Sequence, residues 1–289
     1  MKHRHDIAFV LPALVVVAVF FVYPLLLALN LSFTDSEGFA DYSYVGLQNY
    51  QRIFTRARHL DAIRVTLLFT LLVVVAQTGL GLLFALALQR LPAIRNLCRA
   101  ALFLPAMLSF VVVGYVWQFI YSPFSGGLNA LLAAAGLESL QSAWLGQPVS
   151  ALICVAIAHV WMFTGYTAAI FLAGFAAIPA DLTDAARLDG ARGWQRFRHI
   201  ELPLLAPAMT VNVVLATIGT LKTFELPFIM VRGGPDGATR TLGLQIIETL
   251  FGQYRFGLAS ALSMVLLVVI IAIAWVQNSY LRAREDFSR

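Results

Sequence analysis

Two ionisable residues, Lys222 and Glu225, lie within a long apolar segment of the chain. A charged group in such a segment is costly to keep there, so it marks a candidate functional site. The two residues are three apart, which on one helix would bring them to the same face, close enough to pair. Two interpretations stay open. The residues either pair and only shape the mouth of a pathway, or face the pathway and contact what passes through it.

Other apolar segments contain aromatic and amide side chains that can bind a ligand. Aromatic rings offer flat surfaces, and amides both donate and accept hydrogen bonds. A lone polar residue in such a segment more often bonds a neighbouring helix, and that interpretation also stays open. With Lys222 and Glu225, the candidates for a ligand path are Trp117, Trp161, Tyr166 and Asn212, and further polar residues of the same segments are Gln77, Gln118, His159 and Thr217.

Sequence motifs of known catalytic sites are absent from the chain. It has no H-E-x-x-H, no G-x-S-x-G and no G-x-x-x-x-G-K-[ST] pattern. The two cysteines, Cys98 and Cys154, lie in or beside apolar runs and do not have the spacing of a metal site. We therefore predict no catalytic residue, no metal site and no nucleotide site in this chain.

The composition indicates a protein that crosses a membrane several times. Of the 289 residues, 60% are hydrophobic and only 12% are charged, and the mean hydropathy is +0.80. Soluble domains have about 25% charged residues. The apolar stretches are continuous, which favours helices over a β-barrel. The net charge of +5 fits arginines on the cytoplasmic side of a membrane better than nucleic-acid binding. The predicted fold class is all-α.

Six apolar runs are long enough to span a bilayer, and they form one transmembrane domain over residues 1–289. The first run is longer than the apolar core of a signal peptide. An even number of spans puts both termini on one side, and that side holds 12 of the 20 Lys and Arg residues against 6 in the opposite loops. This bias predicts cytoplasmic termini. The predicted spans are about 7–31, 63–88, 100–121, 151–175, 203–230 and 258–280.

The segment 178–202 is the most polar long stretch between two of these runs. Asp181 is placed to cap a short helix, and Gly190 is placed to end it in the left-handed conformation. A second short helix is predicted over 194–200, and Pro203 suits the first turn of the next span. The predicted product is a helix–turn–helix on the cytoplasmic face.

The faces of this helix–turn–helix allow two interpretations. The segment contains Arg187, Arg192, Arg196 and Arg198, so it could be an amphipathic helix resting on lipid phosphates. Ala185 and Ala186 are small enough for another surface to approach closely, which favours docking into a groove of a protein. We expect Leu188 and Phe197 to pack inward and Trp194 to anchor the turn.

The residues Asp184-Ala-Ala-Arg-Leu-Asp-Gly190-Ala-Arg-Gly-Trp194, followed by Ile200-Glu-Leu-Pro203, resemble the EAA loop of permease subunits in ATP-binding-cassette importers. Asp184 departs from the usual Glu, and Glu201 stands where an uncharged residue is more common. Further stretches resemble the branch that imports sugars and related polyols, the maltose and glycerol-phosphate type: 44–50, 102–105, Trp117, 126–132, 222–227 and 233–235.

The resemblance implies that the loop is a coupling helix seated in a cleft of a cytoplasmic ATPase subunit. Closure of two ATPases would then move the permease subunits as rigid bodies and give alternating access. Asp184 would meet a basic or amide partner, and Gly190 would set the bend. The residues implied in this coupling are Asp184, Ala185, Ala186, Leu188, Asp189, Gly190, Trp194 and Pro203. Because the chain lacks a phosphate-binding loop, ATP and Mg would be bound by the partner.

The implied protein is a multi-pass subunit of the bacterial inner membrane that translocates a sugar or related polyol. Its implied partners are the lipid bilayer, a second permease subunit in a heterodimer, two ATPase subunits and an extracytoplasmic solute-binding protein. The alternative is an ion-coupled secondary transporter that works without an ATPase. The few charges within the spans argue against proton coupling, which needs a relay of titrating groups.

Overall fold

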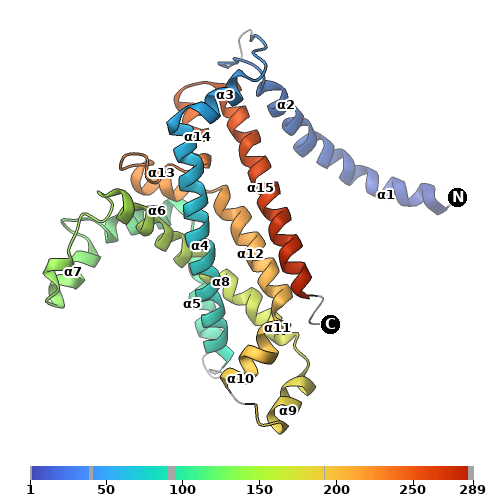
Figure 1. Cartoon of the computed structure of the whole chain (residues 1–289), viewed down its shortest axis with the longest axis vertical. Helices are drawn as coiled ribbons and strands as arrows, with labels where there is room; N and C mark the ends of the chain where they lie inside the picture. The colour runs from blue at the N-terminus through green and yellow to red at the C-terminus, as the bar shows by residue number, and fades with distance from the viewer. Residues whose placement is uncertain (1, 39–41, 90–94, 192, 286–289) are drawn as a thin grey trace. The chain divides into compact units, whose positions relative to one another are not determined.

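The computed structural model describes residues 2–38, 42–89, 95–191 and 193–285, and in these ranges the chain is helical with no strand. One isolated antiparallel bridge joins Thr34 and Tyr44. The all-α fold is thereby confirmed. Figure 1 draws the helices, which are α1 (Lys2–Val17), α2 (Tyr23–Leu31), α3 (Gln48–Thr55), α4 (Ala57–Gln89), α5 (Arg95–Met107), α6 (Phe110–Ile120), α7 (Gly127–Ala134), α8 (Pro148–Ala176), α9 (Ala180–Leu188), α10 (Trp194–Arg196), α11 (Leu202–Leu204), α12 (Ala206–Leu221), α13 (Glu225–Val231), α14 (Leu242–Ile247) and α15 (Phe256–Glu285).

Four helices are long and apolar enough to cross a membrane, covering 10–31, 57–89, 148–176 and 256–281. They fall on the first, second, fourth and sixth predicted spans. The third predicted span corresponds to a pair of helices, 97–107 and 110–120, with a bend of 99° between them. Most of the fifth predicted span is α12, which meets the segment 194–204 at a bend of 66°. The described part of the chain thus has up to six spans if each bent pair counts as one.

The third predicted span, 100–121, contains a break, because a new helix starts at Phe110. Ser109 has extended backbone angles, and its side chain accepts a hydrogen bond from the amide of Val112 at 3.3 Å. This is the geometry of a serine N-cap, which begins a helix and does not continue one. Pro105 precedes the break within α5 and provides no amide for helix bonding.

The fifth predicted span, 203–230, is also interrupted. Pro203 lies in α11, before the bend at Leu205, so it does not occupy the first turn of the long helix α12. A second proline, Pro207, occupies that turn. Prolines four residues apart remove two helix donors and favour a bend between them. Helix α12 then ends at Leu221, and α13 begins only at Glu225.

The chain divides into two compact units, and each is described by itself. The first unit comprises Met1–Leu60 and Gln245–Val268. In it, the Asn49 amide donates to the carbonyls of Ser32 and Thr34 at 3.0 and 2.8 Å, and Asn49 is buried. The most apolar stretch of residues 10–31 has no buried residue, so in a membrane it would face lipid or another chain.

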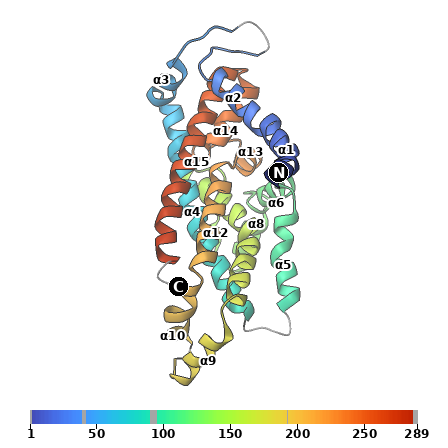
Figure 2. The same cartoon turned by 90° about the vertical axis from the view of Figure 1, so that its right-hand side faces the viewer.

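The second unit comprises Asp61–Leu244 and Val269–Arg289 and contains the larger core. Helix α8 packs against α5, α6, α12 and α13. Where α8 meets α5, the Leu102 carbonyl occupies the space a side chain would need at Gly165. Close backbone approach at a small residue is how apolar helices associate when they have no polar surface to pair. Figures 1 and 2 show α9 and α10 at the end of α12 that is remote from α13.

Candidate functional site: a cavity in the helix bundle and an exposed loop

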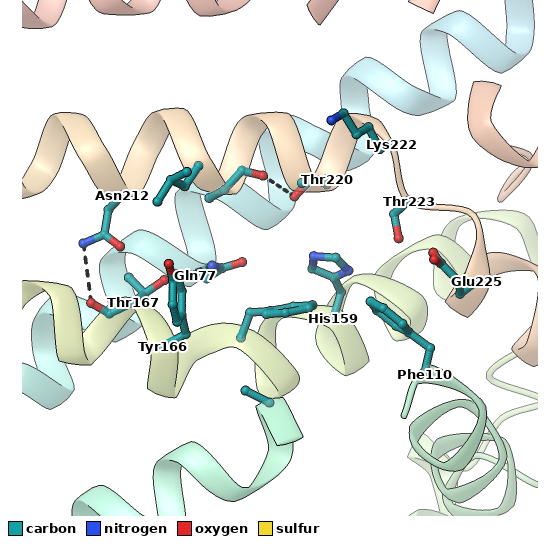
Figure 3. A pocket seen from close by; sticks show the side chains of 15 residues that line it. Gln77, Phe110, His159, Tyr166, Thr167, Asn212, Thr220, Lys222, Thr223 and Glu225 are labelled. Carbon is teal, nitrogen blue, oxygen red and sulfur yellow. Dashed lines mark hydrogen bonds between the residues drawn. The ribbon is translucent and has the colours of Figure 1, made fainter. Parts of the chain in front are cut away.

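A cavity of about 430 Å³ lies within the second unit, between the bundle helices. Side chains from α4, α5, α6, α8, α12 and α13 line it, as does the link between α12 and α13 (Figure 3). The lining combines aromatic and aliphatic groups with several amides, hydroxyls and charges: Gln77, Ala106, Phe110, His159, Phe163, Tyr166, Thr167, Asn212, Leu215, Ala216, Gly219, Thr220, Lys222, Thr223 and Glu225.

At one end of the cavity, polar side chains connect three helices. The Gln77 amide donates to the Thr167 hydroxyl at 2.9 Å, and the Asn212 amide donates to the Thr167 carbonyl at 3.4 Å. Figure 3 shows these groups close to Tyr166. Asn212 therefore makes the interhelical hydrogen bond that was one of its two interpretations, and it also lines the cavity.

Three buried polar atoms on the cavity lining have no hydrogen-bond partner in the part of the chain that the structure describes. They are Gln77 Oε1, His159 Nδ1 and Thr223 Oγ1, and each residue is less than 5% exposed. Buried polar groups are normally hydrogen-bonded. Each of these three atoms has less than 1 Å² of accessible surface, so the surrounding side chains cover them and they do not face the open part of the cavity.

Lys222 and Glu225 both line the other end of the cavity, but they do not share a helix face. Lys222 caps the end of α12 and Glu225 begins α13, so the break between the helices separates them. Among the described residues, the structure has no ion pair between the two. The Glu225 carboxylate instead accepts from the Phe224 amide at 3.2 Å. Of the two interpretations, pairing on one helix face therefore does not occur among the described residues.

The six candidates for a ligand path thus separate into two groups. Tyr166, Asn212, Lys222 and Glu225 line the cavity. Trp117 and Trp161 do not, and their rings meet edge to face at 5.8 Å. Gln77, His159 and Thr223 also line the cavity. The sequence had marked Gln77 and His159 only as lone polar residues and had not distinguished Thr223.

Within the residues that the structure describes, no group of three His, Cys, Asp or Glu residues is placed to hold a metal ion. The cavity lining has one carboxylate and one histidine among mostly neutral groups. Its chemistry is therefore that of hydrogen bonding and ring contact, which suits binding and passage of a solute.

The loop over 178–202 has the two-helix form that was predicted. Helix α9 ends in a Schellman-type closure, in which the Ala191 amide donates to the Ala186 carbonyl at 2.9 Å. Gly190 adopts a φ of +81°, which confirms the predicted left-handed helix end. The helix begins at Ala180, so Asp181 lies in the first turn and is not the cap. A carboxylate there still stabilises the positive end of the helix.

Helix α9 presents an apolar stripe to solvent. Leu182, Ala185 and Leu188 are three apart and all exposed, Leu188 by 89%. The expectation that Leu188 packs inward was wrong, because the inward face is occupied by Ala186, which is 4% exposed. Asp184 and Asp189 are exposed beside the stripe. An exposed leucine beside carboxylates suits a protein partner with an apolar and basic surface.

The second half of the loop contains both buried and exposed aromatic rings. Phe197 is 8% exposed and packs inward as expected, whereas Trp194 is 67% exposed. The two ring centroids lie 5.3 Å apart. Pro203 is exposed at the end of the segment. Of the eight predicted coupling residues, only Ala186 is buried, and the other seven are exposed.

A bundle of apolar helices around a partly polar cavity, with an exposed loop at one end, is the architecture of a membrane transport subunit. The comparisons with known proteins agree. Residues 77–284 match the family model described as "Binding-protein-dependent transport system inner membrane component". The chain belongs to this family, whose members are permease subunits of ATP-binding-cassette transporters and not enzymes.

Relatives match over nearly the full chain. The probable ABC transporter permease protein PH1215 of Pyrococcus horikoshii is 34% identical over 92% of both chains. The trehalose/maltose transport system permease protein MalF of Thermococcus litoralis is 34% identical over 96% of this chain and 93% of its own. A chain from the crystal structure of a bacterial importer of the acidic polysaccharide alginate has the same fold, with a TM-score of 0.84, 22% identity and coverage of 98% and 99%.

Proposed function

We propose that this chain is the permease subunit of an ATP-driven importer that moves a sugar or related polyol delivered by an extracytoplasmic binding protein. The observation that carries this proposal is the cavity of about 430 Å³, whose lining combines aromatic rings with amides and hydroxyls that can bind a hydroxyl-rich solute. The relatives support it, because one is named for trehalose and maltose, one for multiple sugars and one for sn-glycerol-3-phosphate.

The exposed face of α9 supports coupling to an ATPase. Leu182, Ala185 and Leu188 would enter an apolar groove of the partner, while the carboxylate of Asp184 meets a basic or amide group there. Gly190 provides the turn to the second segment, and Trp194 and Pro203 border it. ATP and Mg would be bound by the ATPase.

The proposed assembly contains this chain, a second permease, two ATPase subunits and a binding protein in the bacterial inner membrane. A solved relative of this fold was crystallised with a periplasmic protein carrying an alginate pentasaccharide. The excess of Lys and Arg in the terminal segments and the 178–202 loop favours cytoplasmic termini. The binding protein would then deliver the solute from outside, and the ATPase would act on the loop from the cytoplasmic side.

Uptake into proteoliposomes tests the proposal. The complex is reconstituted with the binding protein outside and ATP inside, and radiolabelled maltose, trehalose and glycerol 3-phosphate are the probes. We expect uptake of at least one probe, and only when ATP and the ATPase subunits are present. Undiminished uptake by this chain without an ATPase would overturn the proposal and favour an ion-coupled carrier.

Two variants test the loop. Gly190→Val forces a β-branched residue into a left-handed turn, which costs at least about 1–2 kcal/mol locally, and Asp184→Lys reverses the exposed charge. We expect either to reduce co-purification of the ATPase several-fold while membrane insertion stays normal. Gly136→Val is the matched control, because Gly136 also has a positive φ and open space around it but lies in another loop. Equal co-purification in all three variants would refute the role of the loop.

A further inference from the structure

We propose that Arg196 and Glu201 are positioning residues that fix the second helical segment of the loop at the end of α4. The ion pair would make this segment move with the bundle as one rigid piece when the ATPase moves. The inference rests on the proposed function, because it gives a task to the loop that docks on the ATPase. It also accounts for Glu201, which stands where an uncharged residue is more common.

The contact between the two side chains is short and largely buried. Arg196 Nε donates to Glu201 Oε1 at 2.7 Å. The Glu201 side chain is only 8% exposed and that of Arg196 is 29% exposed. A carboxylate this far from water needs a charged partner, because an unpaired buried charge is strongly unfavourable. The pair is therefore largely removed from water, unlike an ion pair on the surface.

A π-helical turn brings the two residues together. Five residues along an ordinary α-helix correspond to a rotation of about 140°, so such side chains point apart. Here residues Phe197–Glu201 form a π-turn, in which the Leu202 amide donates to the Phe197 carbonyl. The wider turn places residues five apart on nearly the same face. Short π-turns within helices are frequent at functional positions.

The pair lies where the loop meets a long helix. A cavity of about 250 Å³ is lined by Leu86 and Gln89 of α4 and by Trp194, Arg196, Phe197 and Glu201 of the loop, with Gly193. Glu201 accepts from the Arg196 guanidinium, and the Glu201 carbonyl accepts from the Leu205 amide at the bend into α12. The pair thus links the loop to the bend and borders the same cavity as the end of α4.

A double-mutant cycle in the full transporter complex tests the proposal. The two native cysteines are replaced, and Thr223→Cys is introduced on the cavity lining as a site for maleimide labelling. The measurement is the change in labelling rate when ATP and orthovanadate are added. We expect Arg196→Ala and Glu201→Ala each to reduce this change at least fivefold while the ATPase still co-purifies. The double variant should be no worse than the poorer single variant, as expected of a pair that acts together.

Further variants separate positioning from folding. Glu201→Gln keeps an acceptor for the guanidinium. We therefore expect its ATP-dependent change in labelling rate to lie between that of Glu201→Ala and that of the unmodified pair. Arg198→Ala is the matched control, because Arg198 belongs to the same turn but is exposed, and it should leave the change intact. If a single variant does not fold, Arg196→Met with Glu201→Met removes both charges together and restores packing. We expect this variant to fold and to show a reduced change.

The outcomes are distinct. An unchanged response in both single variants, additive losses, or a full response in the double Met variant would overturn the positioning role. Absence of any ATP-dependent change in the Thr223→Cys complex with an intact pair would instead contradict the proposed function.

Discussion

The contact between α5 and α8 at Gly165 gives a sharp prediction about stability. A Cβ atom at Gly165 would lie 1.8 Å from the Leu102 carbonyl oxygen and 3.1 Å from the Phe103 amide nitrogen. Both are backbone atoms, which cannot rotate away as a side chain can. Ordinary contact begins at 3.4 Å, so Gly165→Ala requires the helices to separate by about 1.6 Å at this point.

We expect Gly165→Ala to be strongly destabilising. Inserting a methyl group into a well-packed core costs about 1–3 kcal/mol where side chains can adjust. Here a whole helix must move, and the movement also loosens contacts on either side, so about 3 kcal/mol or more is expected. For a chain of this size about 3 kcal/mol corresponds to a fall in Tm of roughly 6–12 °C.

Thermal unfolding of the purified protein in detergent measures this effect. Gly79→Ala is the matched control, because Gly79 lies within α4 and a Cβ there meets nothing within 4 Å. An alanine in a helix is favoured over glycine by up to about 1 kcal/mol, so the Tm of the control should stay equal or rise. Equal Tm values for the two variants would refute the close backbone contact.

Two further predictions use threonines in the second unit. Thr66→Val removes the acceptor that the Leu242 amide uses at 2.7 Å, so we expect a loss of about 1–3 kcal/mol in thermal unfolding. Thr70→Val removes a buried hydroxyl one turn later with no partner in the described chain, and it should leave Tm within about 1 °C. Thr223→Val removes a hydroxyl on the cavity lining, so we expect unchanged Tm but a roughly three- to tenfold rise in KM for uptake, equivalent to one hydrogen bond. An unchanged KM would argue against contact between solute and Thr223.

The long continuous helices were predictable from the sequence. Helices α4, α8 and α15 are each more than 25 residues long, and an apolar run of that length has few alternatives to a helix in a membrane. The left-handed end of α9 was equally predictable, because Gly190 was the residue that a helix end requires. Such features depend on local chemistry alone.

Features that depend on packing were harder to predict. Leu188 was expected inside and is exposed, because hydrophobicity alone does not show which face of a short helix meets the bundle. Glu201 was unexplained until the π-turn showed Arg196 beside it. Thr223 had no signal in the sequence, because only its place beside other helices makes its hydroxyl part of a cavity.

The bends and the cavity have a common cause. Ala106 and Phe110 flank the break between α5 and α6, and Lys222 and Glu225 flank the break between α12 and α13; all four line the cavity. Backbone that leaves a helix has unpaired polar groups, which an apolar bundle tolerates only where they are buried in protein or border a polar space. Hydropathy averages over such breaks, so the apolar runs that located the spans were least informative at the residues that form the cavity. Discontinuous helices are for the same reason a better guide to a transport pathway than charge alone.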